Sequence, residues 1–178
     1  GSLGIGANGE GKSTLFKVLA GEIEADSGQI VRAPGLKTLY VPQSVPADRE
    51  DDLEFNRLSG GRRRRRILEE AILSRPDVLL LDEPMIGLDP HAIKELKQML
   101  TEMRAQGRTL LISTHIIDSV DMLWDRTIIM QNGTLCANVT REELEAQNKT
   151  LEDLFFEVTE GIERETNGSV TDAEDTAQ

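Results

Sequence analysis

The sequence holds one cysteine, Cys136, among 178 residues, so no disulfide can form within the chain. A lone thiol suits a protein that works in a reducing compartment. The chain also lacks any apolar run long enough to span a bilayer, although 38% of its residues are hydrophobic. No signal peptide or membrane anchor is visible before the first motif. These absences argue against a disulfide-stapled secreted domain and against an integral membrane protein.

Positive charge is also scarce. Twenty lysines and arginines stand against 32 acids, which gives a formal net charge of −12. This charge argues against a general affinity for nucleic acids or acidic membranes. Nine of the acids and a single arginine lie in residues 151–178. Because residues 160–178 are also poor in apolar side chains, we expect a core over residues 1–158 and an acidic, disordered tail over residues 159–178.

The most informative motif is Gly6-Ala7-Asn8-Gly9-Glu10-Gly11-Lys12-Ser13-Thr14, which matches a phosphate-binding P-loop at every fixed position. Glycines let the loop curl so that its backbone N–H groups point at a phosphate. Lys12 would reach the β- and γ-phosphates, and the Ser13 hydroxyl would ligate Mg²⁺. An ordinary glycine-rich turn is the weaker alternative. We expect the nucleotide to be bound by Gly6, Asn8, Gly9, Glu10, Gly11, Lys12, Ser13 and Thr14.

A second motif follows four consecutive large aliphatic residues, 78–81, and consists of Asp82 and Glu83. Such a run is typical of a strand buried on both faces of a parallel sheet, and these sheets present ligands at their carboxyl ends. Adjacent residues of an extended chain point in opposite directions, so the two carboxylates can take different tasks. Asp82 would hold Mg²⁺ through water, and Glu83 would orient or deprotonate an attacking water. A pair of solvated acids at a strand end is the alternative.

A third motif, Leu58-Ser59-Gly60-Gly61, has the chemistry of an anion-binding helix start, with a hydroxyl N-cap and unobstructed backbone N–H groups. The five arginines that follow, Arg62 to Arg66, could form a nucleic-acid patch. We favour a different interpretation, in which these arginines lie on the solvated and phosphate-facing sides of a helix and pair with acids one turn further on. A fourth motif is the apolar run 109–114, which ends at His115. By itself, a histidine at a strand end is more often structural.

With these motifs in this order, the chain resembles the nucleotide-binding domain of ATP-binding cassette (ABC) ATPases from Leu3 to about Val158. The resemblance implies an α/β fold with a P-loop NTPase core, a mostly parallel sheet and helices on both faces. It also implies the following roles: Walker A for Gly6 to Thr14, catalysis for Glu83, His115 and Gln43, Mg²⁺ binding for Ser13, Gln43 and Asp82, the signature motif for Leu58, Ser59, Gly60 and Gly61, and the D-loop for Asp89.

The same resemblance implies that Mg-ATP is hydrolysed to ADP and phosphate in a head-to-tail dimer, with each nucleotide between one P-loop and the partner's signature motif. The composition favours a cytoplasmic location, at the cytoplasmic face of a membrane if the partner is a transporter subunit, and the net charge favours no direct nucleic-acid binding. Two alternatives stay open. One is a nucleotide-binding module without efficient hydrolysis, and the other is a transporter ATPase fragment that needs a missing segment.

The chain departs from the family pattern in two places. Only five residues precede Gly6, where the family has several strands and an aromatic residue that stacks on adenine; Tyr40 and Trp124 both follow the P-loop. Only 16 positions separate Gln43 from Ser59, where the family inserts a helical subdomain. With a Gly-Ser start typical of a tag remnant, we expect a truncated or engineered core. The part up to Gln43 resembles translation-associated ABC-F proteins, and the part after residue 87 resembles exporter ATPases.

Hydrophobic periodicity predicts strands that alternate with helices, which favours a mostly parallel sheet. An Asn-Gly pair at 132–133 predicts a hairpin turn. We expect strands at 3–5, 37–42, 77–82 and 109–114, a hairpin over 126–139, and helices at 12–20, 60–74, 90–105, 117–123, 141–147 and 150–157.

Overall fold

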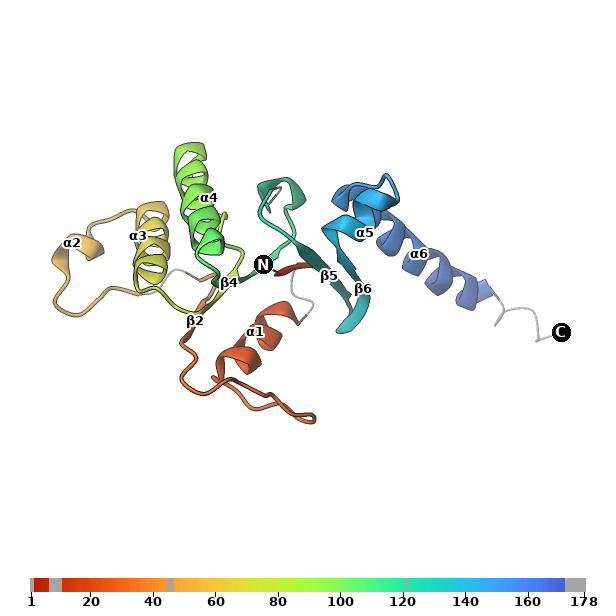
Figure 1. Cartoon of the computed structure of the whole chain (residues 1–178), viewed down its shortest axis with the longest axis horizontal. Helices are drawn as coiled ribbons and strands as arrows, with labels where there is room; N and C mark the ends of the chain where they lie inside the picture. Colours follow the sequence, from red (N-terminus) through yellow and green to blue (C-terminus); the bar gives the residue numbers. More distant parts are fainter. Residues whose placement is uncertain (1, 7–10, 45–46, 121, 172–178) are drawn as a thin grey trace.

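The computed structural model describes residues 2–6, 11–44, 47–120 and 122–171 (Figure 1). Six strands form one sheet in the order β2-β3-β4-β1-β5-β6. All neighbouring strands run parallel except β5 and β6, which form the antiparallel hairpin that the Asn-Gly pair predicted. The strands are β1 (Ser2–Gly6), β2 (Thr38–Val41), β3 (Val78–Asp82), β4 (Thr109–Thr114), β5 (Arg126–Gln131) and β6 (Thr134–Thr140).

Helices cover both faces of this sheet. Figure 1 shows α1 on one side and α3 with α4 on the other, which confirms the predicted α/β class. The helices are α1 (Lys12–Ala20), α2 (Leu53–Asn56), α3 (Gly60–Leu73), α4 (Pro90–Ala105), the 3₁₀ turn η1 (Ile117–Val120), α5 (Arg141–Ala146) and α6 (Leu151–Thr171). None of the helices in the described ranges is long and apolar enough to cross a membrane.

The core is built around β3, which lies between β2 and β4. Leu79, Leu80 and Leu81 are at most 1% exposed, as expected for a strand covered on both faces. Burial of each leucine contributes about 1.5–3 kcal/mol. Because β2, β3, β4 and β1 are parallel, their carboxyl ends meet at one edge. The register there pairs Asp82 with Ser113, so this packing fixes the place where the candidate site forms.

Two elements differ from their prediction. The helix expected at 117–123 is only the single turn η1. The polar stretch after Gln43 contains α2, which the sequence did not indicate. The Asp52 side chain caps α2 by accepting a hydrogen bond from the Phe55 N–H at 2.9 Å. Phe55 is fully buried, and the Arg49 guanidinium lies 4.0 Å from the centre of its ring. One buried aromatic and one cap thus sustain a helix too short to leave a periodic pattern.

The last helix, α6, continues through the expected boundary at residue 158 and ends at Thr171. Its start is capped reciprocally: the Thr150 N–H donates to Asp153 Oδ2 at 2.8 Å, and the Asp153 N–H donates to Thr150 Oγ1 at 3.1 Å. No proline follows to end the helix, and glutamates favour its continuation. Residues 159–171 are therefore helical, whereas residues 172–178 lie outside the described part. The division of the chain into a core and a tail stays a prediction.

Candidate functional site

A cavity of about 70 Å³ lies at the carboxyl edge of the sheet. Its walls come from the start of α1, the loop after β2 and the end of β3. Seven residues with predicted roles line it: Gly11, Lys12, Ser13, Thr14, Gln43, Asp82 and Glu83. Gly6 ends β1, whereas Asn8, Gly9 and Glu10 lie outside the described residues. The fold therefore brings together side chains that are up to about 70 positions apart in the sequence.

Asp82 is held in a fixed orientation by three hydroxyl donors. The Ser13 Oγ donates to Oδ2, the Ser113 Oγ donates to Oδ1 at 2.5 Å, and the Tyr40 hydroxyl donates to Oδ2 at 3.3 Å. Burial raises the pKa of Tyr40 to about 12, and the negative charge of Asp82 acts in the same direction. The phenol therefore stays protonated at neutral pH and remains a donor. Asp82 itself is 3% exposed.

The oxygen atoms around Asp82 suit a magnesium ion. Mg²⁺ prefers oxygen ligands, keeps several waters, and is usually shared between one or two protein side chains and substrate phosphates. Ser13 and Asp82 are in direct contact, and Gln43 lines the same cavity. Within the described ranges, no group of three or more His, Cys, Asp and Glu residues could hold a metal ion alone. This donor set fits a Mg²⁺ that phosphate oxygens help to bind.

Glu83 is almost fully buried, at 2% exposure, and its carboxylate contacts two other predicted site residues. Its Oε1 accepts a hydrogen bond from the His115 backbone N–H at 3.1 Å and lies 2.7 Å from His115 Nδ1. The Lys12 Nζ lies 3.7 Å from the same oxygen. The position of His115 at a strand end indicated no role, and only the family resemblance implied catalysis; the structure places its ring directly against the carboxylate.

The backbone of Glu83 has φ 47°, in the left-handed region that side chains other than glycine rarely adopt. This conformation costs about 1–2 kcal/mol. The Glu83 N–H donates to the Ser113 carbonyl at 2.8 Å and so ties the strained residue to β4. Strain of this kind is found where a side chain must point in a direction that a regular strand would not allow.

The predicted signature motif lies at the start of α3. The Ser59 hydroxyl accepts a hydrogen bond from the Arg62 N–H at 3.4 Å, which confirms the expected N-cap. A Cβ added to Gly61 would lie 2.7 Å from the Gly87 carbonyl oxygen, so only glycine fits there. Asp89, two residues further on, caps α4 by accepting from the Ala92 N–H at 2.9 Å. Among the described residues that line the 70 Å³ cavity, none belongs to these two segments.

The arginine run only partly follows the prediction. Arg65 pairs with Glu69 at 2.8 Å and Arg66 pairs with Glu70 at 3.2 Å, so acids one turn on are indeed partners. Arg64 is different, because it is buried, with 2% exposure. Its position is set by helical spacing, since the buried residues of α3 are Arg64, Leu68 and Ala71. The sequence analysis missed this residue, although its spacing of four and seven from these apolar residues could have indicated it.

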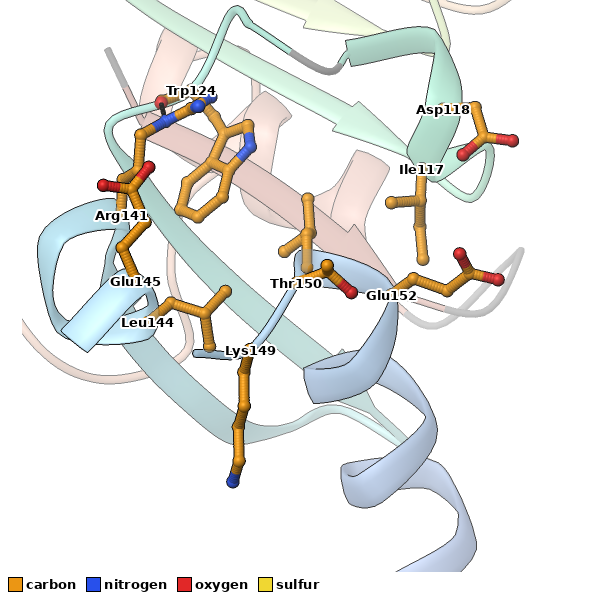
Figure 2. A pocket seen from close by; sticks show the side chains of 10 residues that line it. Ile117, Asp118, Trp124, Arg141, Leu144, Glu145, Lys149, Thr150 and Glu152 are labelled. Carbon is orange, nitrogen blue, oxygen red and sulfur yellow. Dashed lines mark hydrogen bonds between the residues drawn. The ribbon is translucent and has the colours of Figure 1, made fainter. Parts of the chain in front are cut away.

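A second cavity, of about 350 Å³, lies between η1, α5 and the start of α6 (Figure 2). The Arg141 guanidinium lies 4.6 Å from the centre of the Trp124 ring, and its Nε donates to the Trp124 carbonyl at 2.9 Å. None of the described residues that line this cavity also lines the first one. The two aromatic residues considered for adenine stacking therefore make other contacts. Tyr40 donates a hydrogen bond to Asp82, and Trp124 lines this second cavity. Its lining residues are Ile117, Asp118, Trp124, Arg141, Leu144, Glu145, Lys149, Thr150, Leu151 and Glu152.

Two family profiles match the chain. The ABC transporter profile matches residues 4–52, and a profile described as AAA domain, putative AbiEii toxin, Type IV TA system, matches residues 47–121. The chain also resembles a solved structure of an ATP-binding subunit of an ABC transporter, with a TM-score of 0.76 and 24% identity. That match covers 89% of this chain and 88% of the other, and it supports the fold.

Sequence relatives extend this likeness. The zinc import ATP-binding protein ZnuC of Paracoccus denitrificans (strain Pd 1222) is 31% identical over 175 residues, which cover 80% of this chain and 68% of ZnuC. The manganese transport system ATP-binding protein MntA of Synechocystis sp. is 28% identical, with coverages of 83% and 76%. The Nod factor export ATP-binding protein I of Bradyrhizobium diazoefficiens is 29% identical, with coverages of 72% and 58%. From these relatives, the matching profile and the shared fold, the chain belongs to the ATP-binding subunits of ABC transporters and spans about two thirds of the length of its ZnuC relative.

Proposed function

We propose that this chain binds Mg-ATP and hydrolyses it to ADP and phosphate. The proposal rests on the surroundings of Glu83. Its carboxylate is buried beside the P-loop lysine and contacts both the backbone N–H and the ring of His115. A carboxylate held in this way can orient or deprotonate a water molecule, which is the task of the general base in phosphoryl transfer. The start of α1, where we expect the phosphates to bind, lines the same cavity as Glu83.

The start of α1 supports binding of the phosphates. Gly11 has φ 84° and precedes the helix, whose first N–H groups and positive dipole end face the cavity. Lys12 is 5% exposed, so its ammonium group acts from a largely water-free position. Ser13, Asp82 and Gln43 would hold Mg²⁺. When bound, that ion would neutralise charge on the phosphate oxygens during transfer.

We further propose that the active unit is a head-to-tail dimer. The start of α3 has two glycines, whose backbone N–H groups no side chain shields, and the positive end of a helix dipole, both suited to an anion. Since these residues do not line the chain's own phosphate cavity, a partner's nucleotide is the anion that they would bind. A monomer would then bind Mg-ATP but turn it over slowly.

The partner and the location are inferred from the relatives. The relatives are named for zinc import, manganese transport and Nod factor export. We therefore infer that the partner is a membrane transporter subunit and that the chain lies at the cytoplasmic face of a membrane. The named cargoes differ in kind, and we therefore propose no cargo. The ion pairs of Arg65 and Arg66 with glutamates disfavour nucleic-acid binding through that run.

Phosphate release from Mg-ATP, measured over a range of protein concentrations, tests the proposal. We expect turnover that rises more than proportionally with protein, and a fall of at least about 10²-fold in Glu83→Gln. Glu157→Gln is the matched control, because it makes the same change at an exposed residue that pairs with Lys149. Equal turnover in Glu83→Gln and the control would refute the role of Glu83.

Melting with and without Mg-ATP separates the alternatives if no turnover is found. A binding module would be stabilised by the nucleotide through mass action, because only the folded state binds it. An incomplete fragment would show neither turnover nor a cooperative, nucleotide-dependent melting transition.

A further inference from the structure

Arg64 is the buried member of the arginine run, and its guanidinium reaches two strand ends at once. Its Nη1 donates to the Pro42 carbonyl, directly before Gln43. Its Nη2 donates to the Asp82 carbonyl at 2.9 Å and lies 3.4 Å from the Glu83 carbonyl. A side chain of α3 therefore binds the backbone of the two loops that carry Gln43 and Glu83, two of the three predicted catalytic residues.

A buried arginine of this kind is costly if it serves only to fill space. Burial lowers the pKa of Arg64, while the negative charge of Asp82 opposes this effect. In the described part of the chain, its Nε has no hydrogen-bond partner. Apolar side chains of similar size commonly replace buried charges without loss of stability, and Leu68 and Ala71 on the same face are apolar. Because burial of this charge is unfavourable, the presence of arginine indicates that the paired N–H donors of the guanidinium are required at this position.

We propose that Arg64 is a positioning residue, which fixes the carboxylate of Glu83 and the side chain of Gln43 relative to each other. This inference rests on the proposed ATP hydrolysis. The planar guanidinium imposes the separation of the two loops, because its two nitrogens bind carbonyls on different strand ends. It also anchors the carbonyl of Glu83, whose φ of 47° would otherwise relax. Relaxation would turn the Glu83 carboxylate away from the His115 N–H.

The position of Arg64 on α3 adds a consequence. Arg64 lies four positions after Gly60, where α3 begins, so one short helical segment joins the predicted signature motif to the Pro42 and Asp82 carbonyls. In the proposed dimer, the nucleotide bound by the partner would contact this same helix start. In that dimer, Arg64 would connect the helix start that contacts the partner's nucleotide to the backbone of Glu83.

Steady-state kinetics of Arg64→Met and Arg64→Lys test the proposal. Methionine keeps an unbranched apolar stem but is shorter and removes every donor, whereas lysine keeps the charge but loses the fork. Since a displacement of about 1 Å can cost about 10²-fold, we expect kcat of Arg64→Met to fall by about that factor, with KM for Mg-ATP changed by less than about threefold. Arg64→Lys should recover part of kcat. Arg66→Met, on the partly exposed side of α3, should behave as the unmodified chain.

Hydrogen exchange of the protein without nucleotide gives a readout that does not need turnover. The amides of Glu83 and His115 are bonded within the site, and both should exchange faster in Arg64→Met and Arg64→Lys. The amides of β5, which is separated from β3 by two strands, serve as the reference for global stability. Selective acceleration at the site supports positioning, even if the unmodified chain proves inactive and the proposed hydrolysis is wrong.

Two outcomes would overturn the inference. One is a wild-type kcat in folded Arg64→Met. The other is exchange that accelerates equally in β5 and in the site, which would mean that Arg64 only stabilises the fold. If Arg64→Met does not fold, the same two readouts on Arg64→Lys decide.

Discussion

Gly61→Ala, compared with Gly60→Ala, tests how closely the start of α3 packs on the loop before α4. The added Cβ of Gly61→Ala would lie 2.7 Å from the Gly87 carbonyl oxygen, whereas real Cβ atoms essentially never approach within 3.0 Å. The two backbones must therefore separate by at least about 0.3 Å. Overpacking of this kind costs about 1–3 kcal/mol. At Gly60, a Cβ meets nothing within 4 Å.

The two variants share the change from glycine to alanine in the first turn of α3 and differ in this contact. Both replace a glycine in the first turn of the same helix, so any gain in helix propensity, up to about 1 kcal/mol, applies to both. We therefore expect Gly61→Ala to be less stable than Gly60→Ala by about 1–3 kcal/mol. For a chain of this length, this corresponds to about 2–4 °C in melting temperature for each kcal/mol.

Urea unfolding without nucleotide is the appropriate assay, because both glycines belong to the proposed signature motif and turnover would confound the comparison. The midpoint should fall in Gly61→Ala, while the slope of free energy against urea stays the same in both variants. Equal midpoints for the two variants would refute the close approach of Gly61 to Gly87.

Three further predictions concern the nucleotide site and acid stability. Lys12→Ala should weaken Mg-ATP binding by about 10- to 100-fold, because hydrogen bonds to charged groups contribute about 1.5–3 kcal/mol; a smaller nucleotide-induced rise in melting temperature would show it. Removal of Mg²⁺ by EDTA should reduce the same rise for ATP, and an unchanged rise would contradict the proposed metal ligands. The hydrogen bond from Arg49 lowers the pKa of Glu70 in the folded state. The ionised Glu70 therefore stabilises the fold above its unfolded pKa of about 4.3, and this contribution is lost as pH falls through the lower folded pKa. Glu70→Gln should therefore flatten the loss of stability on acidification below about pH 4.3, as followed by urea midpoints, and an unaltered acid profile would contradict it.

Much of the site could be predicted because its signals are local. The P-loop ends directly at the helix it caps, and the four aliphatics before Asp82 mark a strand that is buried on both faces. Ser59 is an N-cap that precedes its helix by one residue, as its side chain indicated. In each case, the conformation depends on neighbours within about four residues. Such signals survive without knowledge of the tertiary structure.

The rest depended on contacts between distant segments. Helical spacing from Leu68 and Ala71 could have indicated that Arg64 is buried. No local signal shows what it binds, because these carbonyls lie about 20 positions away on either side. The short helix α2 exists because Phe55 is buried beneath Arg49 and its neighbours. The contact of His115 with Glu83 spans 32 positions. Only the parallel register of β3 and β4 brings these two residues together.

The charges at the carboxyl edge explain why Mg²⁺ and the nucleotide should bind together. Asp82 and Glu83 are both nearly fully buried, and Lys12 lies 3.7 Å from Glu83. Asp82 is held by hydroxyl groups, which orient its negative charge without cancelling it. A polyphosphate alone would bring further negative charge to this carboxylate, where low solvent access strengthens the repulsion. If Ser13 and Asp82 hold a divalent cation as proposed, that ion would convert the repulsion into attraction, and the carboxylate that disfavours free ATP would favour Mg-ATP.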